Sequence, residues 1–74
     1  MSYAKLRGRI REVFGTQVKF ADAMGMNAAT ISAKLNGKVE WNRDEIEKAC
    51  YVLEIPATEL PEYFFNKKVA FSQL

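Results

Sequence analysis

Histidine is absent from this 74-residue chain, and cysteine occurs once, as Cys50. A His-based catalytic triad, a structural zinc site and an internal disulfide are therefore excluded. The sequence has no run of about 18 apolar residues and no apolar N-terminal signal core, so we expect neither a membrane span nor a signal peptide. Because it also lacks nucleophile–base pairs and phosphate-binding glycine loops, we expect a protein that is not an enzyme and uses no cofactor, metal or small-molecule ligand.

Proline and glycine are also scarce, with two and four residues, while 49% of the chain is hydrophobic and 27% is charged. This composition is typical of a soluble globular protein. Because typical domains have about 100–150 residues, the length allows one small domain. We expect that domain to span residues 1–66 and a short C-terminal tail to span residues 67–74.

The formal net charge of +2 conceals two halves of opposite sign. Residues 1–43 carry eight basic and three acidic side chains, a net charge of +5. Residues 44–66 carry six acids and one lysine, a net charge of −5, and the tail adds two lysines. The division indicates either ordinary solvated charge or one face suited to a polyanion and another that turns away from it, which would solubilise the domain or present a surface to a partner.

Apolar spacing and helix-capping residues predict an all-α fold with five helices. The first helix follows Ser2 as N-cap and ends at Gly15, and the fourth ends before Pro56. The tail is predicted as a strand or as a loose end. The remaining boundaries are residues 17–24 after Thr16, residues 28–35 after Asn27, a capping box at Asn42 and Glu45 that opens the fourth helix, and residues 58–65 with Pro61 in the first turn.

The second and third predicted helices are joined in a way that is typical of a helix-turn-helix. Such a unit needs a small residue where the helices meet, a residue that tolerates positive φ at the turn, and an apolar residue on the second helix. Ala21, Gly25 and Ile31 fill these places in order. The unit predicts a second helix that projects from the surface and can enter the DNA major groove.

The run TQVKFADAMGMNAATISAKLNGK, Thr16–Lys38, resembles the helix-turn-helix of the phage lambda and 434 repressors and of their Cro counterparts. The resemblance extends over about residues 5–60, and the segments LNGKVEW and PEYFF resemble those of small phage-encoded regulators. It implies a compact lambda-repressor-like domain and a transcriptional regulator that binds double-stranded DNA, with residues 28–35 in the major groove. The resemblance also implies that the protein is located in the cytoplasm of a bacterial cell and is associated with the nucleoid.

The resemblance also assigns roles to residues of the helix-turn-helix. Gln17 and Asn36 match phosphate contacts, and Ala28, Ala29 and Ala33 match positions that read base edges. Helical spacing alone gives a similar outward face, which adds Ser32 to these alanines and Asn36.

Alanine cannot form a bidentate hydrogen bond with a base, so this face predicts modest or indirect sequence readout. Base discrimination would then depend on DNA shape and on Asn27, Thr30, Ser32 and Lys34. Lys34 occupies a position that is usually apolar in this motif. The predicted phosphate contacts are Thr16, Gln17, Lys19, Asn36, Lys38 and Arg43, with Arg7 or Arg11 at the rim. If about four to six cations neutralise phosphates, the logarithm of DNA affinity should fall against the logarithm of salt with a slope near −4 to −5.

The alanines and the acidic half favour an alternative function, a protein-interaction module of antirepressor or antitoxin-like type that reads few bases. Cys50 is predicted as a buried thiol, and Trp41 as a residue that fills the connection between the third and fourth helices. A homodimer would form on DNA only or through the C-terminal aromatics, which otherwise join the core: Tyr63, Phe64, Phe65 and Phe71.

Overall fold

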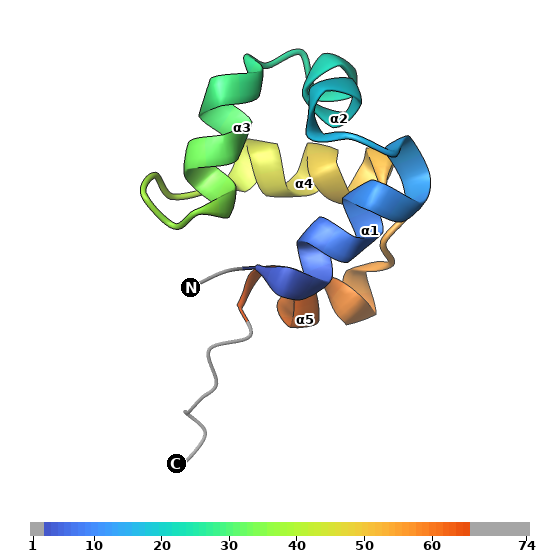
Figure 1. The fold of residues 1–74 in the computed structure, drawn as a ribbon. Helices are drawn as coiled ribbons and strands as arrows, with labels where there is room; N and C mark the ends of the chain where they lie inside the picture. Colours follow the sequence, from blue (N-terminus) through green and yellow to red (C-terminus); the bar gives the residue numbers. More distant parts are fainter. Residues whose placement is uncertain (1–2, 66–74) are drawn as a thin grey trace.

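The computed structural model describes residues 3–65 of the chain, and this part is all-α (Figure 1). The predicted five-helix fold is confirmed. Ser2, predicted as a helix cap, and the tail over residues 67–74 lie outside the described residues. The described part consists of α1 (Ala4–Phe14), α2 (Gln17–Met24), α3 (Ala28–Leu35), α4 (Arg43–Val52), the short 3-10 helix η1 (Ala57–Glu59) and α5 (Leu60–Phe64).

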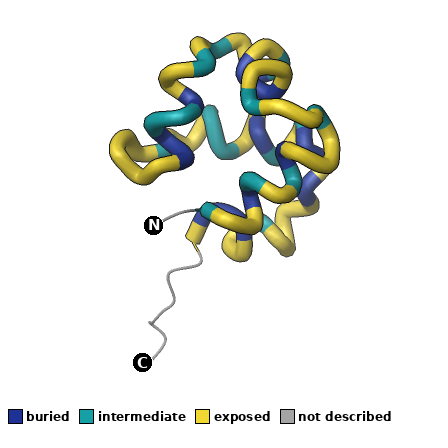
Figure 2. The backbone as a smooth tube through the Cα atoms, in the orientation of Figure 1, coloured by how far each residue is buried: buried dark blue, intermediate teal, exposed yellow. Residues whose placement is uncertain are grey.

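Helix α2 packs against α1, α3 and α4, while α5 packs against α1. Figure 1 shows α3 and α2 at one end of the molecule and α5 at the other, with α4 crossing the middle of the view between the two ends. Figure 2 shows that the buried positions lie where these helices meet. The largest fully buried side chains are Phe20, Leu6, Ile10, Ile31, Leu35 and Leu53.

The starts of α2 and α3 follow the predicted capping residues. Thr16 Oγ1 accepts a hydrogen bond from the backbone N–H of Lys19 at 3.2 Å, and Asn27 Oδ1 accepts one from that of Ala29 at 2.7 Å. The predicted capping box at the start of α4 is also present. Each such cap satisfies a helix-end donor and contributes about 1 kcal/mol to stability.

Helix α5 is shorter than the predicted residues 58–65, because the chain first makes the 3-10 turn η1. Pro61 lies in the first turn of α5, where its missing N–H has no helical acceptor in any case. On α1, the Lys5 ammonium contacts the carboxylate of Glu62, and Arg9 Nε donates to the Leu53 carbonyl at 2.9 Å. These contacts hold the C-terminal half of the domain against α1.

The C-terminal aromatics divide between core and surface. Tyr63 and Phe64 are buried, with 8% and 5% of their surface exposed, and so belong to the core. Phe65 is 58% exposed. Phe71 lies outside the described residues. Among the described residues, no helix is both long and apolar enough to cross a membrane.

Candidate functional site

Helices α2 and α3 meet at a tight turn centred on Gly25. Its φ of 69° is left-handed, and its N–H donates to the Asp22 carbonyl at 3.0 Å while Met26 N–H donates to the Ala21 carbonyl at 2.9 Å. This pair of bonds is the Schellman arrangement that ends a helix at a glycine. Ala21 and Ile31 are buried beneath the turn, as the spacing predicted. The turn therefore fixes how α3 projects beside α2.

The outward face of α3 carries short side chains. Ala29 and Thr30 are exposed, while Ala28, Ser32 and Ala33 are half-buried. The side-chain oxygen of Asn27, a predicted base contact, is occupied by the cap at the start of this helix. The hydroxyl groups of Thr30 and Ser32 are thus the polar groups that α3 itself offers to a groove.

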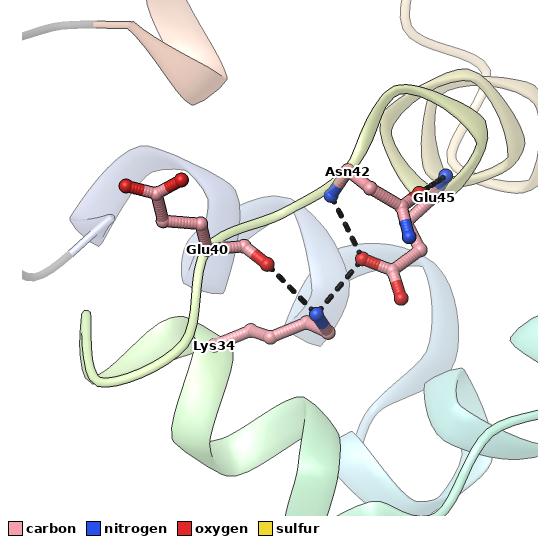
Figure 3. Close-up of polar contacts among 4 residues, drawn as sticks. All are labelled: Lys34, Glu40, Asn42 and Glu45. Carbon is pink, nitrogen blue, oxygen red and sulfur yellow. Dashed lines mark hydrogen bonds and ion pairs between the residues drawn. The ribbon is translucent and has the colours of Figure 1, made fainter.

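Lys34, the charged residue predicted among the base contacts, is buried. Its side chain is 6% exposed, and its ammonium donates to the Glu40 carbonyl at 2.8 Å and pairs with Glu45 Oε1 at 2.9 Å (Figure 3). The same carboxylate oxygen accepts the backbone N–H of Asn42 at 2.9 Å. The last turn of α3 is thereby tied to the capping box of α4.

The carboxylate of Glu45 is held in its charged form by these partners. Burial by itself raises the pKa of Glu45, but the hydrogen bond from the Asn42 backbone and the hydrogen bond and charge of Lys34 outweigh it. The pKa of Glu45 consequently lies below its ordinary value. At neutral pH the site holds a buried, hydrogen-bonded ion pair.

We therefore correct the prediction for Lys34 and remove it from the groove contacts. Its position, three residues after Ile31 and next to Leu35, is on the core side of α3, so its aliphatic stem packs inside while Glu45 neutralises its charge. The sequence contained the signal for this arrangement. The position is usually apolar, and a capping-box glutamate begins the helix that packs beside it.

Two of the predicted phosphate contacts, Thr16 and Gln17, lie together with the predicted rim arginines at the start of α2. A cavity of about 300 Å³ is lined by Arg7, Arg11, Thr16 and Gln17, with Ile10 and Gly15. Arg11 and Lys19 are exposed. The N-terminus of a helix carries a partial positive charge, which basic neighbours strengthen.

The other predicted phosphate contacts do not line that cavity, but Asn36 is bonded to Arg7, which does. Asn36 Oδ1 accepts a hydrogen bond at 2.6 Å from the Arg7 guanidinium, which also donates to the Leu35 carbonyl at 3.0 Å. Arg43 pairs with Glu47 along α4 at 3.2 Å, and Lys38 is exposed in the loop after α3. Arg7 therefore braces the end of α3 against α1.

A second hollow, which sequence reasoning did not find, lies at the α3–α4 connection. We call it the aromatic groove; its volume is about 350 Å³. Trp41 fills the α3–α4 connection as predicted, with its ring 6.5 Å from that of Tyr3 and 5.4 Å from that of Phe64, both edge-on. The groove is lined by Tyr3, Gly37, Glu40, Trp41, Ile46, Phe64 and Phe65.

Cys50 is half-buried beside the core rather than fully enclosed. Burial raises the pKa of its thiol, so the reactive thiolate is scarce at neutral pH. The thiol packs against the core from α4, as its spacing predicted, but it is half-buried where the sequence predicted a buried thiol.

These features define a small all-α domain in which the helix pair α2–α3 is joined to α1 through Arg7 and to α4 through the pair of Lys34 and Glu45. The chain belongs to the family described as "Protein of unknown function (DUF739)", whose model matches residues 1–67. It is also similar to the solution structure of the modulator of repression (MOR) of the temperate bacteriophage TP901-1 from Lactococcus lactis. The two are 52% identical with a TM-score of 0.79, and the match covers 93% of each chain. No curated protein matches the sequence. The similarity places the chain among small phage regulatory proteins.

Proposed function

We propose that this phage regulatory protein modulates repression by contacting another protein, a repressor, and not by reading an operator itself. The observation that carries this proposal is the outward face of α3. The alanines of this face offer no side-chain hydrogen bonds, and the one lysine of α3 lies on its core side in the ion pair with Glu45. Each bidentate base contact is worth about 1–3 kcal/mol of discrimination, and α3 has no side chain able to form one.

Two further observations support the proposal. The similar phage protein is titled a modulator of repression, and 52% identity over most of both chains is a close relationship. Residues 44–66 carry a net charge of −5, which favours a basic protein surface over DNA as the partner of that half.

DNA binding is the second candidate, and the cavity at the start of α2 favours it. Arg11 lines that cavity and is exposed, and Lys19 is exposed in the first turn of α2, an arrangement suited to phosphate. Such binding would follow the DNA backbone and would discriminate little between sequences. A homodimer through the C-terminal aromatics would use Phe65, the exposed one among those described.

The test is a titration of the full chain into a complex of the same phage's repressor with its operator. We expect the apparent affinity of the repressor for the operator to change with added chain, while the chain alone selects no sequence from random duplexes at about 50 mM salt. The variants Arg11→Gln and Lys19→Gln should keep the effect on the repressor, because they remove only phosphate-binding charge. A sequence-selective shift of DNA by the chain alone, or an unchanged repressor, would contradict the proposal.

A further inference from the structure

We propose that the aromatic groove is a docking surface for a protein segment that presents an apolar side chain flanked by lysine or arginine. This inference rests on the proposed function, since it names the surface through which a protein partner would be held. The groove is formed where the start of α1, the connection between α3 and α4, and the end of α5 come together.

The apolar part of the argument comes from the rings that line the groove. The ring of Trp41 makes edge-on contacts with Tyr3 and with Phe64, and the three rings form the wall of the groove. Phe65, which also lines the groove, is 58% exposed. An exposed aromatic beside a hollow of this kind is typical of interaction surfaces, because covering both removes apolar area from water. Aromatic residues are also the side chains most often found at the energetic centre of protein interfaces.

Trp41 adds a polar observation. Its Nε1 atom is buried and has no acceptor in the part of the chain that the structure describes. A buried indole N–H normally has an acceptor, so the ring is incompletely satisfied in the free chain. A protein segment brings backbone carbonyl groups, which can accept this hydrogen bond once the ring adjusts to the occupant.

The charges around the groove determine whether a basic or an acidic segment binds there more favourably. Glu40 lines it, and Figure 3 shows that the carboxylate of Glu40 points away from the Lys34 ammonium, which binds the main-chain carbonyl instead. Asp44 is exposed in the first turn of α4, close along the chain. Lys34, whose ammonium lies 6.0 Å from the centre of the Trp41 ring, is neutralised by Glu45. The exposed Lys38 follows Gly37 in the chain but does not line the groove, so among the described residues Glu40 is the charged side chain of the lining. The rim therefore attracts a basic segment and disfavours nucleic acid.

The experiment uses Trp41, the single tryptophan of the chain, as the reporter. The full chain is titrated with helical peptides that carry the same Leu and Phe pair in a lysine-rich, a glutamate-rich or a serine-rich background. We expect the lysine-rich peptide to shift the Trp41 emission and to bind at least about tenfold more tightly than the glutamate-rich peptide.

Two matched variants locate the binding. Phe65→Ser removes an exposed aromatic at the groove and should weaken the lysine-rich peptide at least about fivefold. Tyr51→Ser removes an aromatic that is 83% exposed on α4 and does not line the groove, so it should leave binding unchanged. Both side chains are exposed, and circular dichroism checks that each variant folds.

Four results would overturn the inference. The first two are that no peptide binds at about 1 mM, or that the lysine-rich and glutamate-rich peptides bind equally well. The other two are that Phe65→Ser and Tyr51→Ser weaken peptide binding equally, or that the Trp41 emission of the chain alone changes with its concentration, which would indicate that a second copy occupies the groove. A Phe71→Ser variant that shifts the emission without peptide would instead assign the groove to the chain's own C-terminal segment. None of these results depends on DNA. They are therefore distinguishable from failure of the proposed function, which the repressor titration reports separately.

Discussion

The buried pair of Lys34 and Glu45 provides the sharpest energetic prediction. At 2.9 Å and an effective dielectric constant of about 20, Coulomb's law gives an attraction of about 6 kcal/mol before desolvation. Removing both ions from water costs several kcal/mol each, so the net contribution of the pair is far smaller. What remains large is the cost of leaving one ion buried alone.

Two single substitutions should therefore differ in cost. Glu45→Gln keeps the capping box, because glutamine can serve at that position, and so it removes mainly the charge. It strands the nearly buried ammonium of Lys34, and we expect a loss of about 2–3 kcal/mol in the free energy of unfolding. Lys34→Met leaves a carboxylate that is 19% exposed and still bonded to Asn42, so we expect a loss of about 1–2 kcal/mol.

The double variant Lys34→Met/Glu45→Gln should be more stable than the sum of the single losses predicts, with a coupling energy of about 1–2 kcal/mol. Urea unfolding followed by circular dichroism measures all four proteins at neutral pH. The exposed pair of Arg43 and Glu47 is the matched control, and its coupling should be about 0.3–0.5 kcal/mol. If the two cycles gave the same coupling energy, the assignment of Lys34 as an internal structural lysine would be refuted.

The remaining predictions concern pH, backbone conformation and thiol reactivity. Folding lowers the pKa of Glu45, so ionised Glu45 stabilises the folded chain fully above its ordinary pKa of 4.5. This contribution is lost as the pH falls through the lower pKa of the folded state. The Lys34→Met/Glu45→Gln variant lacks the carboxylate, so its free energy of unfolding should fall less with acid. Gly25→Ala should lower the free energy of unfolding by about 1–2 kcal/mol, because Gly25 has a left-handed φ. Gly8→Ala, in the middle of α1 with open space around it, should raise that free energy by about 0.5–1 kcal/mol. Thermal unfolding measures both variants, and equal effects would contradict the turn geometry. Cys50 should be alkylated more slowly than a free cysteine at mildly alkaline pH, and an equal rate would contradict its burial.

Local chemistry made most of the fold predictable. Thr16, Asn27 and Gly25 act within a few residues of themselves, so their roles at the helix ends follow from residue type and position alone. The buried face of each helix follows from 3.6-residue spacing. Helix α5 was predicted too long, because Pro61 admits both a helix start and a preceding 3-10 turn and the spacing does not separate them.

The candidate site was less predictable because its features join distant parts of the chain. Lysine side chains are solvated in most proteins. The burial of Lys34 requires two partners from later in the chain, the Glu40 carbonyl of the α3–α4 connection and the Glu45 carboxylate of α4. The aromatic groove unites Tyr3 near one end of the sequence with Phe65 near the other. Neither pairing leaves a periodic signal. A lysine at a usually apolar position and a capping-box glutamate can be noted in the sequence, but only the tertiary fold shows that the two meet.

The same long-range contacts change what the charge of residues 1–43 means. Of its eight basic side chains, five are engaged within the described part of the chain, in ion pairs or in hydrogen bonds to backbone carbonyls: Lys5, Arg7, Arg9, Lys34 and Arg43.

Within residues 1–43, the exposed cations outside these contacts are Arg11, Lys19 and Lys38. Three phosphate contacts give a slope of about −3 for the logarithm of DNA affinity against the logarithm of salt, in place of the −4 to −5 expected from counting charges along the sequence. A measured slope of −4 or steeper would show that further cations reach DNA, either the exposed Lys48 beside the Gly25 turn or cations released from the pairs, and it would restore the sequence-based interpretation of a DNA-binding face. A slope near −3 or weaker fits a domain whose basic residues serve mainly to hold its own helices together.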